Sequence, residues 1–154
     1  MRLFLILQFF SFSLIFSEPL KAGDELKLIQ YQTQFGDEVT VPESTSRLIF
    51  ASEMEASKIA HSVLENAGAD YLKNRSAVLV SDIHRMPYFI TKFVALPKLK
   101  SYSYTIHLIR EEGPGEIFPR EKGKLTLISL KKYKVLSVKY ISSSAELKEE
   151  LEKK

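Results

Sequence analysis

The stretch that decides the fold runs from Arg47 to Ile83 and reads RLIFASEMEASKIAHSVLENAGADYLKNRSAVLVSDI. It begins and ends with short apolar runs, Arg47–Ala51 and Ala77–Ile83, which are typical of strands buried on both faces. Between them the apolar residues change to a helical spacing. A strand, a helix and a strand in this order form a right-handed crossover, so the sequence predicts two parallel neighbouring strands.

The predicted helix between these strands, Glu53 to Gly68, has signals at both ends. Ser52 is placed as the N-cap, and Glu55 three residues later completes a capping box. Gly68 supplies the stop. The apolar positions repeat every three or four residues, as an amphipathic helix requires: Met54, Ala56, Ile59, Ala60, Val63, Leu64 and Ala67.

Outward from this unit, turn and periodicity signals predict the remaining elements. Before it, Asp24–Val41 is expected to form a hairpin whose turn is Gln34-Phe35-Gly36-Asp37. After it the sequence predicts a short helix from Pro87 to Leu96-Pro97, a strand Tyr104–Ile109, a loop at Gly113-Pro114-Gly115, an antiparallel hairpin of Leu125–Leu130 and Val135–Ile141, and a last helix capped by Ser144.

The composition is that of one small globular domain without thiol chemistry. The chain has 154 residues, of which 45% are hydrophobic and 27% charged, and it has no cysteine. Disulfides, cysteine nucleophiles, thiolate metal sites and dithiol exchange are therefore excluded. The net charge of +3 is small, and the lysines near the C-terminus alternate with glutamates, so we expect no nucleic-acid partner.

The beginning of the chain reads as an export signal. A basic start is followed by an apolar run from Leu3 to Phe16 and by a small residue, Ser17, which are the three parts of a secretory signal peptide. We expect residues 1–17 to be a signal peptide, cut after Ser17 or alternatively after Ala22, and residues 18–154 to be a single domain. A retained N-terminal anchor and a core helix are the alternatives. Export without cysteine favours a bacterial periplasm or secretion.

The order of these elements, together with the sequence at the first strand end, resembles the thioredoxin fold in its longer secreted form. In that fold a strand end with a leading phenylalanine runs into a helix that starts with Cys-x-x-Cys, and Phe50-Ala51-Ser52-Glu53-Met54-Glu55-Ala56-Ser57-Lys58 occupies this place. By this register Glu55 and Lys58 stand at the two cysteine positions. The resemblance implies an α/β, thioredoxin-like fold with a mixed central sheet, an N-terminal hairpin and helices on both faces.

A second resemblance rests on Asp82-Ile83-His84-Arg85-Met86-Pro87 and on Phe93-Val94-Ala95-Leu96-Pro97-Lys98. These stretches are similar to a family of small secreted bacterial proteins, related to thioredoxin, whose function is not established. Some members carry a flavin-dehydrogenase label. This chain has no Gly-x-Gly-x-x-Gly motif and only 6 glycines, so we expect no cofactor.

Two departures from thioredoxins limit what the resemblance implies. Both redox cysteines are absent, and no proline stands near Tyr104-Thr105, where the cis-proline before a sheet strand is expected. Without a thiolate there is no nucleophile for disulfide exchange or for attack on a peroxide. A glutaredoxin or peroxiredoxin role therefore does not carry over.

Parallel sheets bind their ligands beyond the carboxyl ends of the strands, near helix N-termini. The ligand edge predicted on this basis consists of Ser52, Glu53, Glu55, Lys58, Asp82, His84, Arg85 and Tyr104. Asp82 and His84 are two residues apart and face the same side of a strand, so with Arg85 they offer acid–base chemistry or a site for a small anion. The structural alternative is that Asp82 caps the loop or pairs with Arg85.

Other kinds of site find less support. No serine stands in a Gly-x-Ser-x-Gly context, and the histidines lack the spacing of metal ligands, so we predict no catalytic residue and no metal site. These histidines are His61, His84 and His107. An aromatic wall beside a ligand is one reading of Tyr102, Tyr104 and Phe118, and core packing is the other.

The sequence therefore favours a non-catalytic thioredoxin-like periplasmic protein that binds an envelope protein or a small ligand. An alternative is a periplasmic enzyme or redox-accessory protein that uses Asp82, His84 and Arg85. A structural or assembly factor of the envelope is the third hypothesis. Membrane contact is expected only through an uncleaved leader.

Overall fold

The two apolar runs that decide the fold are neighbouring strands in the middle of one sheet. In the computed structural model, which describes residues 18–153, β3 (Arg47–Ala51) pairs in parallel with β4 (Ala77–Asp82). The predicted parallel pair is therefore confirmed. The predicted signal peptide, residues 1–17, lies outside the described residues.

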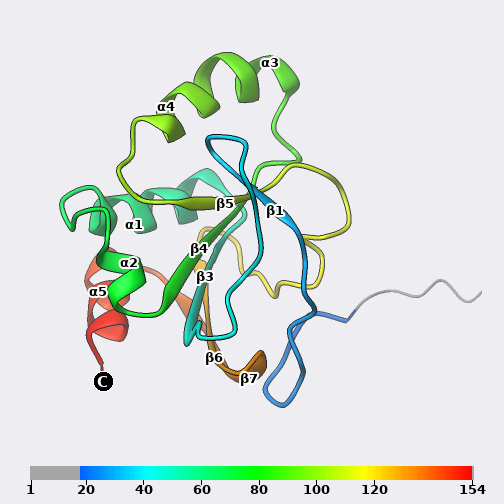
Figure 1. The fold of residues 1–154 in the computed structure, drawn as a ribbon, viewed down its shortest axis with the longest axis vertical. Coiled ribbons are helices and arrows are strands. Elements are labelled where there is room, and N and C mark those ends of the chain that lie inside the picture. The colour runs from blue at the N-terminus through cyan, green and yellow to red at the C-terminus, as the bar shows by residue number, and fades with distance from the viewer. Residues whose placement is uncertain (1–17, 154) are drawn as a thin grey trace, which may run out of the picture.

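The sheet has seven strands in the order β2-β1-β5-β4-β3-β6-β7 (Figure 1). β5 (Ile106–Ile109) lies parallel to β4, whereas β6 (Leu125–Lys131) runs antiparallel to β3 and turns tightly into β7 (Lys134–Ile141). The predicted mixed sheet and the predicted C-terminal hairpin are both confirmed.

The N-terminal hairpin is also confirmed, and its tip is fastened to the sheet. β1 (Tyr31–Thr33) and β2 (Glu38–Val39) pair antiparallel, and β1 continues the sheet beside β5. Gln34 in the turn is buried: its Nε2 donates to the Tyr104 carbonyl at 2.7 Å, and its Oε1 accepts from the Ile106 N–H at 2.9 Å. One side chain thus satisfies two backbone groups of the segment that leads into β5.

Each face of the sheet carries its own hydrophobic cluster. The first cluster includes buried residues of α1 (Met54–Leu64), α2 (Tyr71–Asn74) and α5 (Ser144–Glu152). The second cluster, around Phe50 and Phe118, consists of strand and loop residues within the described part of the chain. Helices therefore cover one face, and the N-terminal segment and the loop after β5 take the place of the helical cover expected on the other.

α1 begins one residue later than its sequence signals predict. Glu53 is the N-cap, with extended φ and ψ of −138° and 162°, and no side chain caps the helix, so the Ser52–Glu55 capping box is not formed. Glu53 Oε2 instead accepts a hydrogen bond from the Gly123 N–H at 2.9 Å, because the chain that leads into β6 passes this helix start. α1 also ends at Leu64 rather than near Gly68.

The helix after β4 continues through a proline. It consists of α3 (Tyr88–Ile90), the π-helical turn η1 (Thr91–Ala95) and α4 (Leu96–Lys100), whereas the sequence predicts an end near Leu96-Pro97. Proline lacks the N–H of the helical ladder, and its ring crowds the preceding turn. The wider π turn directly before this proline relieves the crowding, so the helix does not have to end.

The last helix is capped by Ser143 rather than by the predicted Ser144. Ser143 Oγ accepts from the Glu146 N–H at 3.2 Å, and Glu146 Oε2 accepts from the Ser142 N–H at 2.9 Å. Ser143 thus caps the helix one residue before the predicted position, and Glu146 reaches back to the N–H of the residue before the cap. No helix in residues 18–153 is both long enough and apolar enough to cross a membrane.

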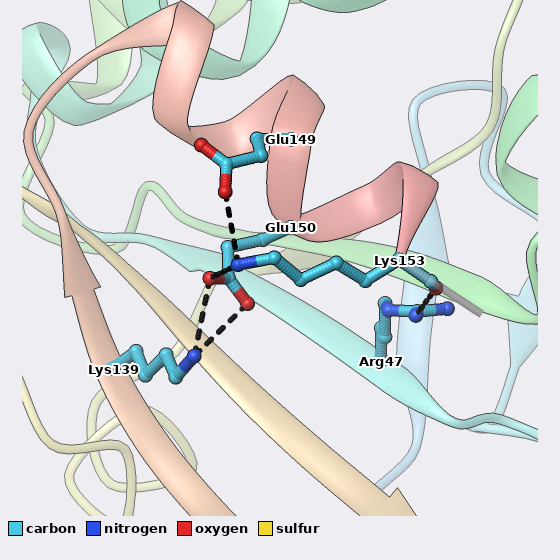
Figure 2. A network of polar contacts seen from close by, with 5 residues as sticks. All are labelled: Arg47, Lys139, Glu149, Glu150 and Lys153. Carbon is cyan, nitrogen blue, oxygen red and sulfur yellow. Dashed lines mark hydrogen bonds and ion pairs between the residues drawn. The ribbon is translucent and has the colours of Figure 1, made fainter.

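Polar contacts hold the end of α5 against the sheet (Figure 2). Glu150 accepts hydrogen bonds from Lys139 of β7 at 3.1 Å and from Lys153 at 2.6 Å. Arg47 of β3 donates to the Lys153 carbonyl, as Figure 2 shows. Both lysines are half exposed, so these ion pairs contribute little to stability compared with the buried leucines of α5.

Candidate functional site

The central strands end at one edge of the sheet, which we call the carboxyl edge. β3 and β4 end side by side there, and Asp82 at the end of β4 is opposite Ile109 at the end of β5. β6 starts at the same edge, with Thr126 opposite Phe50. The loop between β5 and β6 therefore also reaches the carboxyl edge, which combines residues from distant parts of the sequence.

Asp82 is the buried centre of the carboxyl edge, with 2% of its side chain exposed. Its Oδ1 accepts a hydrogen bond from the His84 N–H at 3.2 Å and lies 2.5 Å from Nδ1 of the same residue. Its Oδ2 is 3.5 Å from Arg120 Nη2 and has no hydrogen-bond partner among the described residues. The carboxylate thus lies between an imidazole and a guanidinium.

The Asp82 carboxylate fixes the orientation of the His84 ring. An ionised carboxylate only accepts hydrogen bonds, so Nδ1 of His84 carries the proton and Nε2 is left for another partner. The His84 side chain is 13% exposed, so the ring is held in one orientation and still reaches solvent. Such an imidazole can hydrogen-bond a ligand or exchange a proton with it.

The loop after β5 supplies two site residues that sequence reasoning misses, Gly115 and Arg120. Arg120 Nη2 donates to the Gly115 carbonyl at 2.6 Å, and its guanidinium carbon lies 5.3 Å from the centre of the Phe50 ring. A Cβ on Gly115 would lie 2.2 Å from Asp82 Oδ2. The carboxylate therefore fits against the loop only because residue 115 has no side chain. The Gly-Pro-Gly signal predicts a loop, but it does not show what the loop contacts.

Arg85 lies beside this cluster without joining it. Its side chain is exposed, and within the described part of the chain it makes no ion pair with Asp82. Of the two structural alternatives for Asp82, the pair with Arg85 is therefore wrong, whereas the loop cap is formed, because Oδ1 accepts a hydrogen bond from the His84 N–H. His84, in the turn next to Arg85, contacts one oxygen of the carboxylate, and Arg120 from the loop after β5 lies beside the other.

Comparison with known proteins rests on the structure. The sequence matches no family model and no curated protein. The structure is similar to the peroxidoxin BcpB from Mycobacterium tuberculosis, with a TM-score of 0.57 and 16% identity over 86% of this chain and 94% of that chain. It is also similar to the thioredoxin domain of the thiol-disulfide oxidoreductase BVU-2223 from Bacteroides vulgatus, with a TM-score of 0.56 and 11% identity over 86% and 99% of the two chains. The fold is thioredoxin-like.

The thioredoxin-like chain carries no thiol at the start of α1. Glu55 and Lys58, which stand at the two cysteine positions by the sequence register, are exposed on α1, and Ser52 before the helix is half-buried. The peptide bonds of the described residues include no cis bond, in agreement with the lack of a proline at Tyr104-Thr105. Thiol exchange is impossible, so any chemistry at this edge belongs to other groups.

Tyr104 does not belong to the carboxyl edge. It precedes β5 and so lies at the opposite, amino edge of the parallel strands, where it is 1% exposed. Its hydroxyl lies 2.5 Å from His61 Nδ1, and the His61 ring stacks on Tyr102 with 4.4 Å between centroids. Burial lowers the pKa of His61 to about 4 and raises the pKa of Tyr104, so both are neutral at neutral pH.

The aromatic wall of Tyr102, Tyr104 and Phe118 is not formed. Tyr102 and Tyr104 pack in the cluster on one face of the sheet, and Phe118 packs in the cluster on the other face.

The three histidines of the thioredoxin-like chain contact different partners. His61 pairs with Tyr104 and His84 with Asp82, as described above. His107 is buried with its ring edge-on to Tyr31 at 5.7 Å. Among residues 18–153, no three histidine, aspartate or glutamate side chains gather in a way that would hold a metal ion.

Proposed function

We propose that this thioredoxin-like protein is redox-inactive and non-catalytic, and that it binds a protein partner or a small ligand outside the cytoplasm. The binding site is the carboxyl edge around His84. The observation that supports this site is the buried Asp82 carboxylate, which orients the imidazole from behind.

The Asp82 cluster costs the fold free energy, and this favours a role in binding. Burial of a carboxylate costs several kcal/mol unless hydrogen bonds and opposite charge offset the loss of water. Here one carboxylate oxygen has no hydrogen-bond partner, and the nearest guanidinium nitrogen is 3.5 Å away. A hydrophobic side chain at position 82 would fill the same space without that cost. The cluster is better explained by the orientation that it gives to His84 than by stability.

His84 and Arg85 define the chemistry of the ligand. Nε2 of His84 accepts a hydrogen bond when the ring is neutral and donates one when it is protonated, and Arg85 always donates. Arg85 follows His84 directly in the sequence, and its side chain is exposed. A partner segment or small molecule that presents a carboxylate next to a hydroxyl or amide group matches this pair.

The place of action is supported by the sequence. The basic start, apolar run and small residue of residues 1–17 fit a secretory signal peptide, and the absence of cysteine suits a bacterial periplasm. We therefore place the protein in the periplasm or among secreted proteins, with an envelope protein or a small molecule as its ligand.

The bond between Asp82 and His84 also favours a second function. A carboxylate on Nδ1 is the arrangement that orients an imidazole as a general base. In a periplasmic enzyme or redox-accessory protein, Asp82 and His84 would act on a small substrate, and Arg120 would take the place beside the carboxylate that the sequence assigns to Arg85. Asp82→Asn separates the two functions, because it keeps the shape of the site and removes the charge behind the base.

Site-specific photo-cross-linking tests the proposed site. A photo-reactive amino acid replaces Arg85 in one variant and Lys73 in another; both positions are exposed, but Lys73 lies on α2 at the amino edge. Bacterial cells that produce the full chain are irradiated and fractionated, and adducts are identified by their mass. We expect a discrete adduct from position 85, found in the periplasm or the medium, and no such adduct from position 73.

A third variant controls for the role of the imidazole. His84→Ala in the position-85 background is expected to remove most of the adduct. It also lowers the melting temperature, because the buried Asp82 carboxylate loses the ring that hydrogen-bonds it, so irradiation is carried out at a temperature where circular dichroism shows the variant folded. Equal adducts from both positions, or an adduct that survives the loss of His84, would contradict a binding site at the carboxyl edge. Recovery of the chain from the cytoplasm alone would contradict the proposed location.

A further inference from the structure

A group of large apolar side chains on α3 and η1 is open to solvent. Tyr88, Phe89, Ile90, Phe93 and Val94 are between 47% and 72% exposed. We call these five side chains the aromatic patch. Single exposed apolar residues are ordinary on protein surfaces, whereas several that adjoin one another mark a place of interaction.

The aromatic patch is continuous and stands apart from the core. Phe89 contacts Tyr88 edge-on at 5.7 Å and stacks on Phe93 at 6.3 Å between ring centroids. Lys92 Nζ lies 5.6 Å from the Tyr88 ring centre and 5.5 Å from that of Phe93. Figure 1 shows the helix that carries the patch at the outer margin of the molecule, and none of the five side chains belongs to either hydrophobic cluster.

The charged residues of the segment that carries the patch have one sign. Residues 83–110 contain no aspartate or glutamate. The same helical segment carries Lys92, Lys98 and Lys100, all of them exposed. An apolar helical segment whose own charged residues are all cations is complementary to a surface that is apolar inside and negative at its boundary.

We propose that the aromatic patch docks on a lipid bilayer that contains anionic lipids. Its rings insert at the boundary between headgroups and acyl chains, and the lysines beside them face the headgroup phosphates. The helical segment Tyr88–Lys100 is too short to cross a bilayer, so it lies in the plane of the interface. This membrane contact differs from the one expected of the leader, and it does not depend on the ligand of the carboxyl edge.

Charge also argues against a second copy of the chain as the occupant. Two copies joined through this face would bring Lys92, Lys98 and Lys100 of one copy against the same lysines of the other. Like charges at a desolvated interface oppose association. An anionic bilayer satisfies the apolar and the charged parts of the surface together.

A dye placed in the patch tests this proposal in the full chain. Because the chain has no cysteine, one introduced cysteine takes an environment-sensitive dye at a chosen place. Val94→Cys puts the dye in the aromatic patch, and Lys73→Cys puts it on α2 as the control. Vesicles contain phosphatidylcholine alone or phosphatidylcholine and phosphatidylglycerol in equal parts. We expect a blue shift at position 94 and not at position 73, and only with the anionic vesicles.

Two double variants test the two parts of the surface. Phe89→Ser with Phe93→Ser, and separately Lys92→Glu with Lys98→Glu, are expected to weaken binding to anionic vesicles by about tenfold or more. Lys148→Glu on α5 is the charge control and should bind like the unaltered chain.

Several results would overturn the proposal. Equal dye shifts at positions 73 and 94, or equal shifts with neutral and anionic vesicles, would show that the patch does not dock in this way. Binding that neither double variant weakens would assign the attachment to another part of the chain. A shift at position 94 that depends on protein concentration without vesicles would assign the patch to a second copy.

Discussion

Gly115→Ala is expected to lower the free energy of unfolding by about 3 kcal/mol, a large effect for one added methyl group in a loop. The new Cβ would lie 2.2 Å from Asp82 Oδ2. The carboxylate cannot turn away, because Oδ1 is held by the backbone N–H and the ring nitrogen of His84. The loop must move instead, which strains the hydrogen bond from Arg120 to the Gly115 carbonyl. Urea denaturation of the purified chain measures this loss.

Removal of the carboxylate should abolish the effect. In an Asp82→Ala background the atoms that clash with the new Cβ are gone, so Gly115→Ala should cost less than about 1 kcal/mol. The four proteins form a double-mutant cycle whose coupling energy is about 2 kcal/mol. If Gly115→Ala is equally harmful with and without the Asp82 side chain, the loop does not pack on the carboxylate as described.

Gln34→Ala is expected to destabilise the chain by about 2–4 kcal/mol, because it leaves two buried backbone groups without partners. The side-chain amide donates to the Tyr104 carbonyl at 2.7 Å and accepts from the Ile106 N–H at 2.9 Å. Both bonds hold the segment that enters β5, and β5 joins the N-terminal hairpin to the rest of the sheet. The midpoint and slope of urea denaturation give the change.

Gln32→Ala is the matched control. Gln32 is the same residue type on β1, but its side chain is exposed, so its loss should change stability by less than about 0.5 kcal/mol. Equal effects of the two substitutions would mean that the buried Gln34 amide does not hold β5. A large effect confined to Gln34 confirms that the hairpin tip is structural.

The fold could be predicted from the sequence where its signals are local. The apolar runs of β3 and β4 and the helical period between them depend only on neighbouring residues, and the handedness of the crossover then fixes the parallel pairing. Helix ends depend on more than their local sequence. Ser52 and Ser144 are both in good capping sequences, but Glu53 and Ser143 are the caps, since the path of the chain into each helix decides which residue stays extended.

The candidate site could be predicted only in part, because its contacts join distant segments. Asp82 and His84 follow from their spacing at a strand end. Arg120 and Gly115 reach them through a loop whose course has no local signal. The prediction that Tyr104 belongs to the ligand edge is wrong, because a residue just before a parallel strand lies at the amino edge, whereas ligands gather at the carboxyl edge.

The proposed function requires that Asp82 holds the His84 ring through Nδ1 and leaves Nε2 for a ligand. Long-range proton–nitrogen correlation spectra of the imidazole rings measure this directly, because protonated and unprotonated ring nitrogens resonate far apart. At a pH where the ring is neutral, we expect the His84 proton on Nδ1, and we expect Asp82→Ala to move it to Nε2. A His84 proton on Nε2 in the unaltered chain, or a tautomer that does not change when Asp82 is removed, would contradict this arrangement.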